Sequence, residues 1–152
     1  MDCKCSNFHE IIIFALMIIQ KEIRLSHHSY GVHLITEEIT RQLSRFPKEG
    51  ILHLFIKHTS AGLTINENAD PSVRHDFEQF FDYLVPEAWS GYTHTMEGSD
   101  DMPAHIKSSL FGSSVSVPIT DGQLNLGTWQ GIYLGEFRKR GSQRQVVATI
   151  YS

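Results

Sequence analysis

Residues 113–151 read SSVSVPITDGQLNLGTWQGIYLGEFRKRGSQRQVVATIY, and this stretch decides the fold. It holds four apolar runs rich in β-branched and aromatic residues, separated by short turn signals, which predicts strands over 113–119, 123–126, 128–137 and 143–151. Asp121-Gly122 and Gly141-Ser142 supply the residues typical of hairpin turns. Strands that follow one another through short turns favour antiparallel pairing.

The preceding residues add strands and helices in alternation. Strands are expected over 18–25, 52–56 and 61–66, with a turn at Gly31 and a tight turn over 60–62. A helix is expected from Thr36 until Pro47 and Gly50 stop it. Further helices are expected to start at Asp70-Pro71 and at Asp101-Met-Pro103, with a loop over 89–98 between them.

Periodicity also predicts which faces of the two later helices are buried. One apolar stripe on the first of them is expected to be core, and it consists of Val73, Phe77, Phe80, Phe81 and Leu84. On the second helix, Ile106 and Leu110 are expected to point inward, and Gly112 marks its end.

These elements predict a single α+β domain whose centre is an antiparallel β-sandwich core with about three helices. The 152 residues are enough to bury a core, and the apolar fraction of 41% is ordinary for a globular domain. A (β/α)₈ barrel is excluded because such barrels need about 250 residues and regular β/α alternation.

The charge balance excludes an electrostatic nucleic-acid binder. The chain has 13 basic and 17 acidic residues, so its net charge is −4. The densest basic group, Arg138-Lys139-Arg140 with Arg144, is interpreted as a charged hairpin tip.

The N-terminal residues are expected to lie outside the domain. Cys3 and Cys5 are too close in sequence to staple the fold, so nothing indicates an oxidising compartment. The nine apolar residues 11–19 are about half of a membrane span. We expect residues 1–16 to be an N-terminal extension, residues 17–152 to be the domain, and the protein to be cytoplasmic without a membrane partner.

Residues 58–106 hold an unusual density of imidazoles and carboxylates. His58 ends an expected strand, His94 lies in the loop and His105 lies on the short helix. Three imidazoles with an open fourth position would form an ordinary Zn²⁺-type site. The alternative is that each ring makes only structural hydrogen bonds, since no His-x-x-x-His pair fixes two ligands on one helix face.

Four motifs give the chain a resemblance to a known family. His58-Thr-Ser-Ala61, Asn66-Glu-Asn-Ala-Asp-Pro-Ser-Val-Arg-His-Asp76, Asp100-Asp-Met-Pro-Ala-His-Ile-Lys-Ser-Ser109 and Gly127-Thr-Trp-Gln-Gly131 are similar to the YjbQ family, also called UPF0047. The resemblance runs from about Met17 to the C-terminus. It implies a small single-domain homotrimer and a thiamine-phosphate synthase activity.

The residue types suggest roles in such a reaction. Glu67 has no capping role and is a candidate general base, whereas Asp70 is explained by helix capping as well as by catalysis. Helix starts attract phosphate, and a divalent metal such as Zn²⁺ or Mg²⁺ could help to neutralise it. Trp129 could stack on a heteroaromatic ring or pack in the core. The predicted catalytic set is Glu67, Asp70 and Asp76; the predicted substrate or phosphate set is Arg74, Lys107, Ser108, Ser109, Trp129 and Arg138.

Two functions are therefore expected, one implied by the family resemblance and one indicated by the residues. The first is a thiamine-phosphate synthase-type transferase that joins an aminopyrimidine pyrophosphate to a thiazole phosphate. The second is a trimeric metal-binding protein in which His58, His94 and His105 hold Zn²⁺ for ligand binding or hydrolysis.

Overall fold

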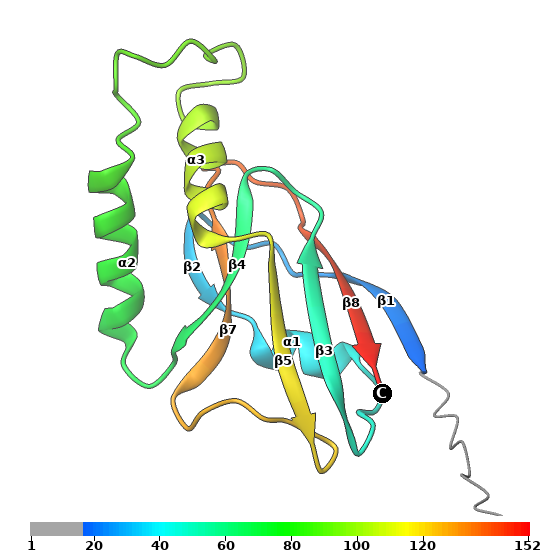
Figure 1. Ribbon diagram of the computed structural model, residues 1–152. Coiled ribbons are helices and arrows are strands. Elements are labelled where there is room, and N and C mark those ends of the chain that lie inside the picture. Colours follow the sequence, from blue (N-terminus) through cyan, green and yellow to red (C-terminus); the bar gives the residue numbers. More distant parts are fainter. Residues whose placement is uncertain (1–16) are drawn as a thin grey trace, which may run out of the picture.

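The computed structural model describes residues 17–152, which form two antiparallel sheets and three helices (Figure 1). The expected extension over residues 1–16 lies outside the described residues. No helix within the described part is long and apolar enough to cross a membrane. The larger sheet has the order β1-β8-β3-β5-β6, with β1 at Ile18–Arg24, β8 at Gln145–Tyr151, β3 at Glu49–Ile56, β5 at Ser114–Thr120 and β6 at Gln123–Leu124.

The smaller sheet has the order β2-β7-β4 and carries two of the three helices on its outer face. Its strands are β2 at Gly31–Leu34, β7 at Gln130–Glu136 and β4 at Ala61–Glu67; the helices are α1 at Thr36–Gln42, α2 at Pro71–Leu84 and α3 at Asp101–Phe111. Figure 1 shows α2 and α3 side by side, with the loop that joins them running across the end of the molecule. The expected α+β fold with an antiparallel sandwich and three helices is confirmed.

The main core lies between the two sheets. Leu52 and Leu54 of β3 meet Ile132 and Leu134 of β7, and all four side chains are fully buried. Ile39 of α1 joins the same cluster. Burial of this apolar surface is the dominant favourable term in folding.

A second cluster lies on the other face of the small sheet. Tyr133 of β7 alternates with Ile132 and Leu134, so its ring faces the helices rather than the large sheet. Phe111 of α3 and Phe137 pack edge to face there with ring centroids 5.5 Å apart. Strand β7 is therefore buried on both faces, which explains its almost unbroken apolar sequence.

Two local signals act as predicted. Asp70 is the N-cap of α2, where its carboxylate accepts the Ser72 backbone N–H at 2.8 Å and Pro71 occupies the first turn. Asp121 and Gly122 both have positive φ, 51° and 77°, in the turn that joins β5 to β6. A two-residue hairpin turn of this kind needs positive φ at both positions.

The expected hairpin at Gly141-Ser142 is wrong, and the expected tight turn over residues 60–62 does not pair the strands on either side of it. Strands β3 and β4, on either side of residues 57–60, belong to different sheets, and so do β7 and β8 around Gly141-Ser142. Strand β7 pairs with β2 and β4, whereas β8 pairs with β1 and β3. The chain changes direction slightly before each predicted position, at residues 59–60 and 139–140, and in both places it crosses between the sheets.

The region around Gly31 is also corrected. It was expected to be only a turn, but Gly31 is the first residue of β2, which pairs with β7. Gly31 has φ of 132°, and a Cβ there would lie 2.5 Å from Glu78 Oε1. The same Glu78 oxygen accepts the Val32 N–H at 3.0 Å, so the absence of a side chain lets α2 attach to the strand.

The predicted helix faces need correction as well. No residue of α2 is fully buried, and only Phe77 and Phe81 of the expected stripe reach the second cluster. Phe80 is 61% exposed. On α3, Ile106 is half-buried and Leu110 is 56% exposed, whereas Phe111 is buried. The homotrimer implied by the resemblance would give the exposed apolar side chains of α2 a place to pack, and it stays a prediction.

The corrected face of α3 gives a stability prediction. Phe111→Ala should cost roughly 3–5 kcal/mol in the free energy of unfolding, because it empties the centre of the aromatic cluster. Leu110→Ala should change it by no more than about 0.5 kcal/mol, because that side chain is exposed. Urea unfolding of both variants measures this, and equal losses would contradict the orientation of α3.

Candidate metal centre

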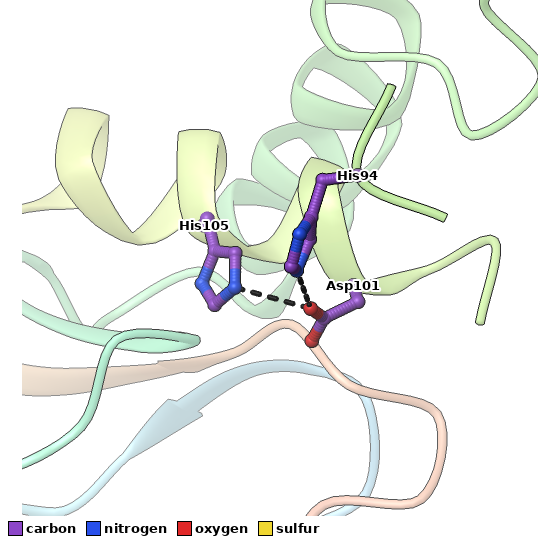
Figure 2. A group of neighbouring side chains, drawn as sticks. All are labelled: His94, Asp101 and His105. Atoms are coloured by element: carbon purple, nitrogen blue, oxygen red, sulfur yellow. Dashed lines mark hydrogen bonds and ion pairs between the residues drawn. The ribbon is translucent and has the colours of Figure 1, made fainter. Parts of the chain in front are cut away.

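Three side chains converge beside the start of α3 (Figure 2). Nε2 of His94 lies 2.8 Å from Oδ2 of Asp101, and Nε2 of His105 lies 3.1 Å from the same oxygen. One ligand atom from each residue lies within 4.8 Å of the others. Atoms that share a zinc ion at bonds of roughly 2.0–2.2 Å lie at most about 4.4 Å apart, so small adjustments suffice to bring all three onto one ion.

The chain positions these residues through a helix and a loop. Asp101 is the first residue of α3 and His105 follows four residues later, so both project from one side of the helix. His94 comes from the loop between α2 and α3. The other end of α3 is fixed against β4, where the Leu63 N–H donates to the Gly112 carbonyl at 2.8 Å.

The Asp101 carboxylate is buried and held from behind. Its side chain is only 2% exposed, and its Oδ1 pairs with the Arg138 guanidinium. Arg138 also donates to Asp100 Oδ2 at 3.2 Å and to the Glu97 carbonyl at 2.9 Å. Arg138 therefore compensates the buried charge and leaves Oδ2 directed at the two imidazoles.

The hydrogen bonds of His105 leave two hydrogen-bond acceptors facing each other at the centre of this group. Its Nδ1 lies 2.9 Å from the Thr59 carbonyl, which can only accept, so Nδ1 carries the proton. In the neutral ring Nε2 is then an acceptor, and it faces another acceptor, the Asp101 oxygen, at 3.1 Å. A proton or a metal cation between them resolves this contact. A backbone carbonyl behind a ligating histidine is a common support of metal sites.

The donor set distinguishes between the metals expected from the sequence. Two imidazole nitrogens and one carboxylate oxygen are typical ligands of Zn²⁺, while Mg²⁺ prefers oxygen ligands and water. Three protein ligands leave a coordination position open, as in catalytic zinc sites.

Two hollows adjoin the group. One has a volume of about 590 Å³ and is lined by His58, Thr59, Ala61, His105, Ser108, Ser109 and Ser113. We call it the serine hollow. The second, of about 380 Å³, has both His94 and the exposed Trp89 in its lining. The ligand group thus lies where a small molecule can approach it.

His58 lines the serine hollow but its ring nitrogens have other partners. Nε2 accepts the Gln145 backbone N–H at 2.8 Å, and Nδ1 lies 3.4 Å from the Arg144 guanidinium. Burial, and then the neighbouring Arg144 charge, lower the pKa of His58. The structure therefore brings His94 and His105 together with Asp101, while His58 stands apart from this group and serves the β8 backbone.

A buried ion pair lies behind His58. Arg144 binds Glu136 through two hydrogen bonds of 2.6 Å, and both residues are buried. Ser60 Oγ accepts a further N–H from Arg144 at 3.2 Å. This paired guanidinium has few donors left for a ligand.

The residues predicted to bind phosphate are engaged within the protein. Lys107 is 4% exposed, and its ammonium lies 2.5 Å from Asp82 and 2.8 Å from the Tyr30 hydroxyl. Ser108 and Ser109 donate their hydroxyl protons to backbone carbonyls. Arg138 is held by the carboxylates of the first turn of α3. Its expected place at a charged hairpin tip is wrong, because the basic segment folds back onto α3 and the loop before it.

The remaining predicted residues lie away from the ligand group. Glu67 ends β4, whereas Thr59, which contacts His105, precedes the start of that strand. The Ser72 N–H bond lowers the pKa of the capping Asp70. Trp129 is 66% exposed and its carbonyl accepts the Asn68 N–H. Arg74 lies on α2 in contact with a small apolar hollow, and Asp76 is exposed on the same helix.

The sequence did not indicate Asp101 as a candidate ligand, nor the position of Glu97. Asp101 was treated only as a helix start, although Asp-x-x-x-His spacing places a carboxylate and an imidazole on one helix face as well as two histidines would. Glu97 Oε2 lies 3.9 Å from His94 Nε2, so a second carboxylate borders the group. No sequence pattern distinguishes that loop residue from its neighbours.

The lowered pKa of His58 gives a pH-dependence prediction. The unfolded ring protonates near pH 6.5, whereas the folded ring resists protonation. The unfolded state therefore binds more protons as pH falls, and stability should decrease from about pH 7.5 down to the folded pKa and then level off. His58→Gln keeps an acceptor and should flatten this part of the profile. Melting temperatures of both metal-free proteins between pH 8 and 5 measure the difference; parallel profiles would contradict it.

Comparison with known proteins identifies the family. The profile of the family described as UPF0047 protein YjbQ-like matches residues 21–152. The UPF0047 protein YjbQ of Escherichia coli O157:H7 is 52% identical over 133 residues, covering 86% of this chain and 96% of that protein. A solved YjbQ/UPF0047 protein from Clostridium acetobutylicum is 38% identical and superposes with a TM-score of 0.68. The match covers 85% of this chain and 97% of that protein. A solved YbjQ-like protein of unknown function from Sulfolobus solfataricus P2 shares the fold at 22% identity, with a TM-score of 0.77. The match covers 91% of this chain and 99% of that protein. The chain therefore belongs to the UPF0047 family of YjbQ-like proteins.

Proposed function

We propose that this protein binds Zn²⁺ through His94, Asp101 and His105 and uses it to hydrolyse a small substrate. The observation that carries the proposal is the acceptor-to-acceptor contact between His105 Nε2 and Asp101 Oδ2 at 3.1 Å, next to His94. A cation at this position satisfies three ligand atoms together. A bound zinc ion supplies a Lewis acid and lowers the pKa of a coordinated water.

The protein side chains around the site have distinct tasks in this proposal. Asp101 brings negative charge to the ion, and Arg138 fixes its carboxylate. The Thr59 carbonyl sets the tautomer of His105 and orients its ring. These contacts keep two of the ligands in place on α3 before any ion arrives, and His94 is the one ligand that a loop supplies.

Glu97 is proposed as the proton acceptor for the attacking water. Its carboxylate lies 3.9 Å from the His94 nitrogen, and the side chain is 65% exposed. A general base must lie within hydrogen-bond reach of the proton that it takes, directly or through one water. Glu97 is close enough to serve without being one of the three ligands.

The family resemblance implies a second reaction, thiamine-phosphate synthesis, and it stays a prediction. The residues assigned to it from the sequence are spread over the chain. Glu67 is the last residue of β4, at the end away from His105, and the Trp129 carbonyl accepts the N–H of the next residue, Asn68. The Lys107 ammonium is paired with Asp82. A synthase reaction within one chain would therefore draw on other groups than those predicted.

The metal proposal predicts stoichiometric zinc binding that depends on Asp101. Asp101→Asn removes the anionic ligand at constant volume, and it should weaken the Zn²⁺ affinity by at least about 100-fold, since even changes behind the ligands typically cost 10–100-fold. Isothermal titration of chelator-treated protein with Zn²⁺ measures this. His94→Gln, in an exposed loop, repeats the test without disturbing α3.

His53→Gln is the matched control for this titration. His53 lies on β3 and bonds to Ser116, outside the ligand group, so its loss should leave zinc affinity unchanged. Equal affinity in wild type, Asp101→Asn and His94→Gln would remove the proposed site.

The hydrolytic part makes a separate prediction with 4-nitrophenyl acetate as the probe. Zinc-loaded wild type should hydrolyse it, and Glu97→Gln should lower the rate by about 10²–10⁴ while zinc affinity stays within about threefold. Release of 4-nitrophenolate measures the rate. If the protein binds zinc but shows no zinc-dependent hydrolysis, the metal-binding proposal stands and the hydrolase proposal is wrong.

A further inference from the structure

The serine hollow beside His105 differs in chemistry from a phosphate site. None of its lining residues is Lys or Arg. The Arg144 guanidinium, which contacts the lining residue His58, is bound on two nitrogens by Glu136, and its other hydrogen bonds go to His58 and Ser60. Phosphate recognition ordinarily needs cationic or backbone N–H donors directed at the ligand.

The serine hydroxyls on α3 are turned toward acceptors of the protein. Ser108 Oγ lies 2.5 Å from the Thr59 carbonyl and 2.9 Å from the His105 carbonyl, and Ser109 Oγ lies 2.8 Å from the His105 carbonyl. A hydroxyl has one proton and two lone pairs. With the proton given to a carbonyl, each serine presents only lone pairs to a ligand.

The position of the serine hollow at the end of α3 also disfavours an anionic ligand. Ser108 and Ser109 belong to the last turn of the helix, which ends at Phe111. The C-terminal end of a helix carries partial negative charge and disfavours anions. The hydroxyls of Thr59 and Ser113 can rotate to donate or to accept a hydrogen bond, so they do not discriminate between ligands. Ser108 and Ser109 therefore decide which ligand is preferred.

We infer that the serine hollow takes a ligand that donates hydrogen bonds through nitrogen, such as an amide or amine N–H, beside the metal rather than a phosphate ester. This inference rests on the proposed zinc site and names the substrate class for it. In the corresponding reaction, water adds across a C–N bond: the carbonyl carbon keeps the oxygen, and the nitrogen takes the proton and leaves as an amine.

Two hydroxamates that differ by one N–H test the inference by binding alone. Acetohydroxamate and N-methylacetohydroxamate share the oxygens that ligate zinc, but only the first has an N–H. Zinc-loaded wild type should bind acetohydroxamate about fivefold more tightly in isothermal titration, as one net hydrogen bond supplies. Inorganic phosphate should bind more weakly than either hydroxamate.

Serine variants show whether a preference for acetohydroxamate comes from hydrogen bonds to the serines or from steric exclusion of the N-methyl group. Ser109→Ala changes an exposed residue and should reduce the preference for the N–H, and Ser108→Ala provides a second variant if the first keeps part of it. Equal binding of the two hydroxamates, a preference that survives both serine changes, or tighter binding of phosphate would each overturn the inference while the zinc site stands. Failure of wild type to bind zinc would remove the proposed function and this inference together.

Discussion

The absence of a side chain at Gly62 controls how the whole candidate site is placed. A Cβ at this position would lie 2.8 Å from Phe111 Cβ and 2.9 Å from the Gly112 carbonyl. Helix α3 therefore rests directly on β4, and the Leu63 N–H bonds to its C-terminal carbonyl. This contact sets the height of α3 over the small sheet, and with it the reach of His105 toward the Thr59 carbonyl. Any larger residue would push the helix, the aromatic cluster and two of the three ligands outward together.

Local chemistry predicted much of the fold, but not the pairing of strands across layers. The cap at Asp70 and the turn at Asp121-Gly122 act as their sequences indicate, because each depends on backbone groups within a few residues. The crossings over residues 57–60 and 137–144 use similar turn residues, yet they join different sheets. A turn signal reports that the chain reverses and carries no information on which strand it meets next.

The same limit explains the reversed face of α3. Leu110 is exposed and Ile106 is only half-buried. The buried side of the helix carries Ala104 and Phe111 together with Asp101, Lys107 and Ser108, and each of these three polar residues has a partner distant in sequence. Hydrophobic periodicity cannot find a face whose polar groups are paired in three dimensions. The two histidines of the candidate site, on the loop and on the helix, could be predicted from the sequence. The role of Arg138 could not, because it depends on a contact with Asp100, 38 residues earlier in the chain.

The buried pair of Glu136 and Arg144 has a consequence for how this chain can vary. Losing either partner alone leaves an uncompensated charge in the interior, a change that costs roughly 3–5 kcal/mol, whereas exchanging both for apolar residues of similar volume is often neutral. Gly141 lies over the same carboxylate, where a Cβ would sit 2.7 Å from Glu136. We therefore expect these three positions to change only together, and the crossing between β7 and β8 is restrained by this ion pair as well as by the packing of Phe137.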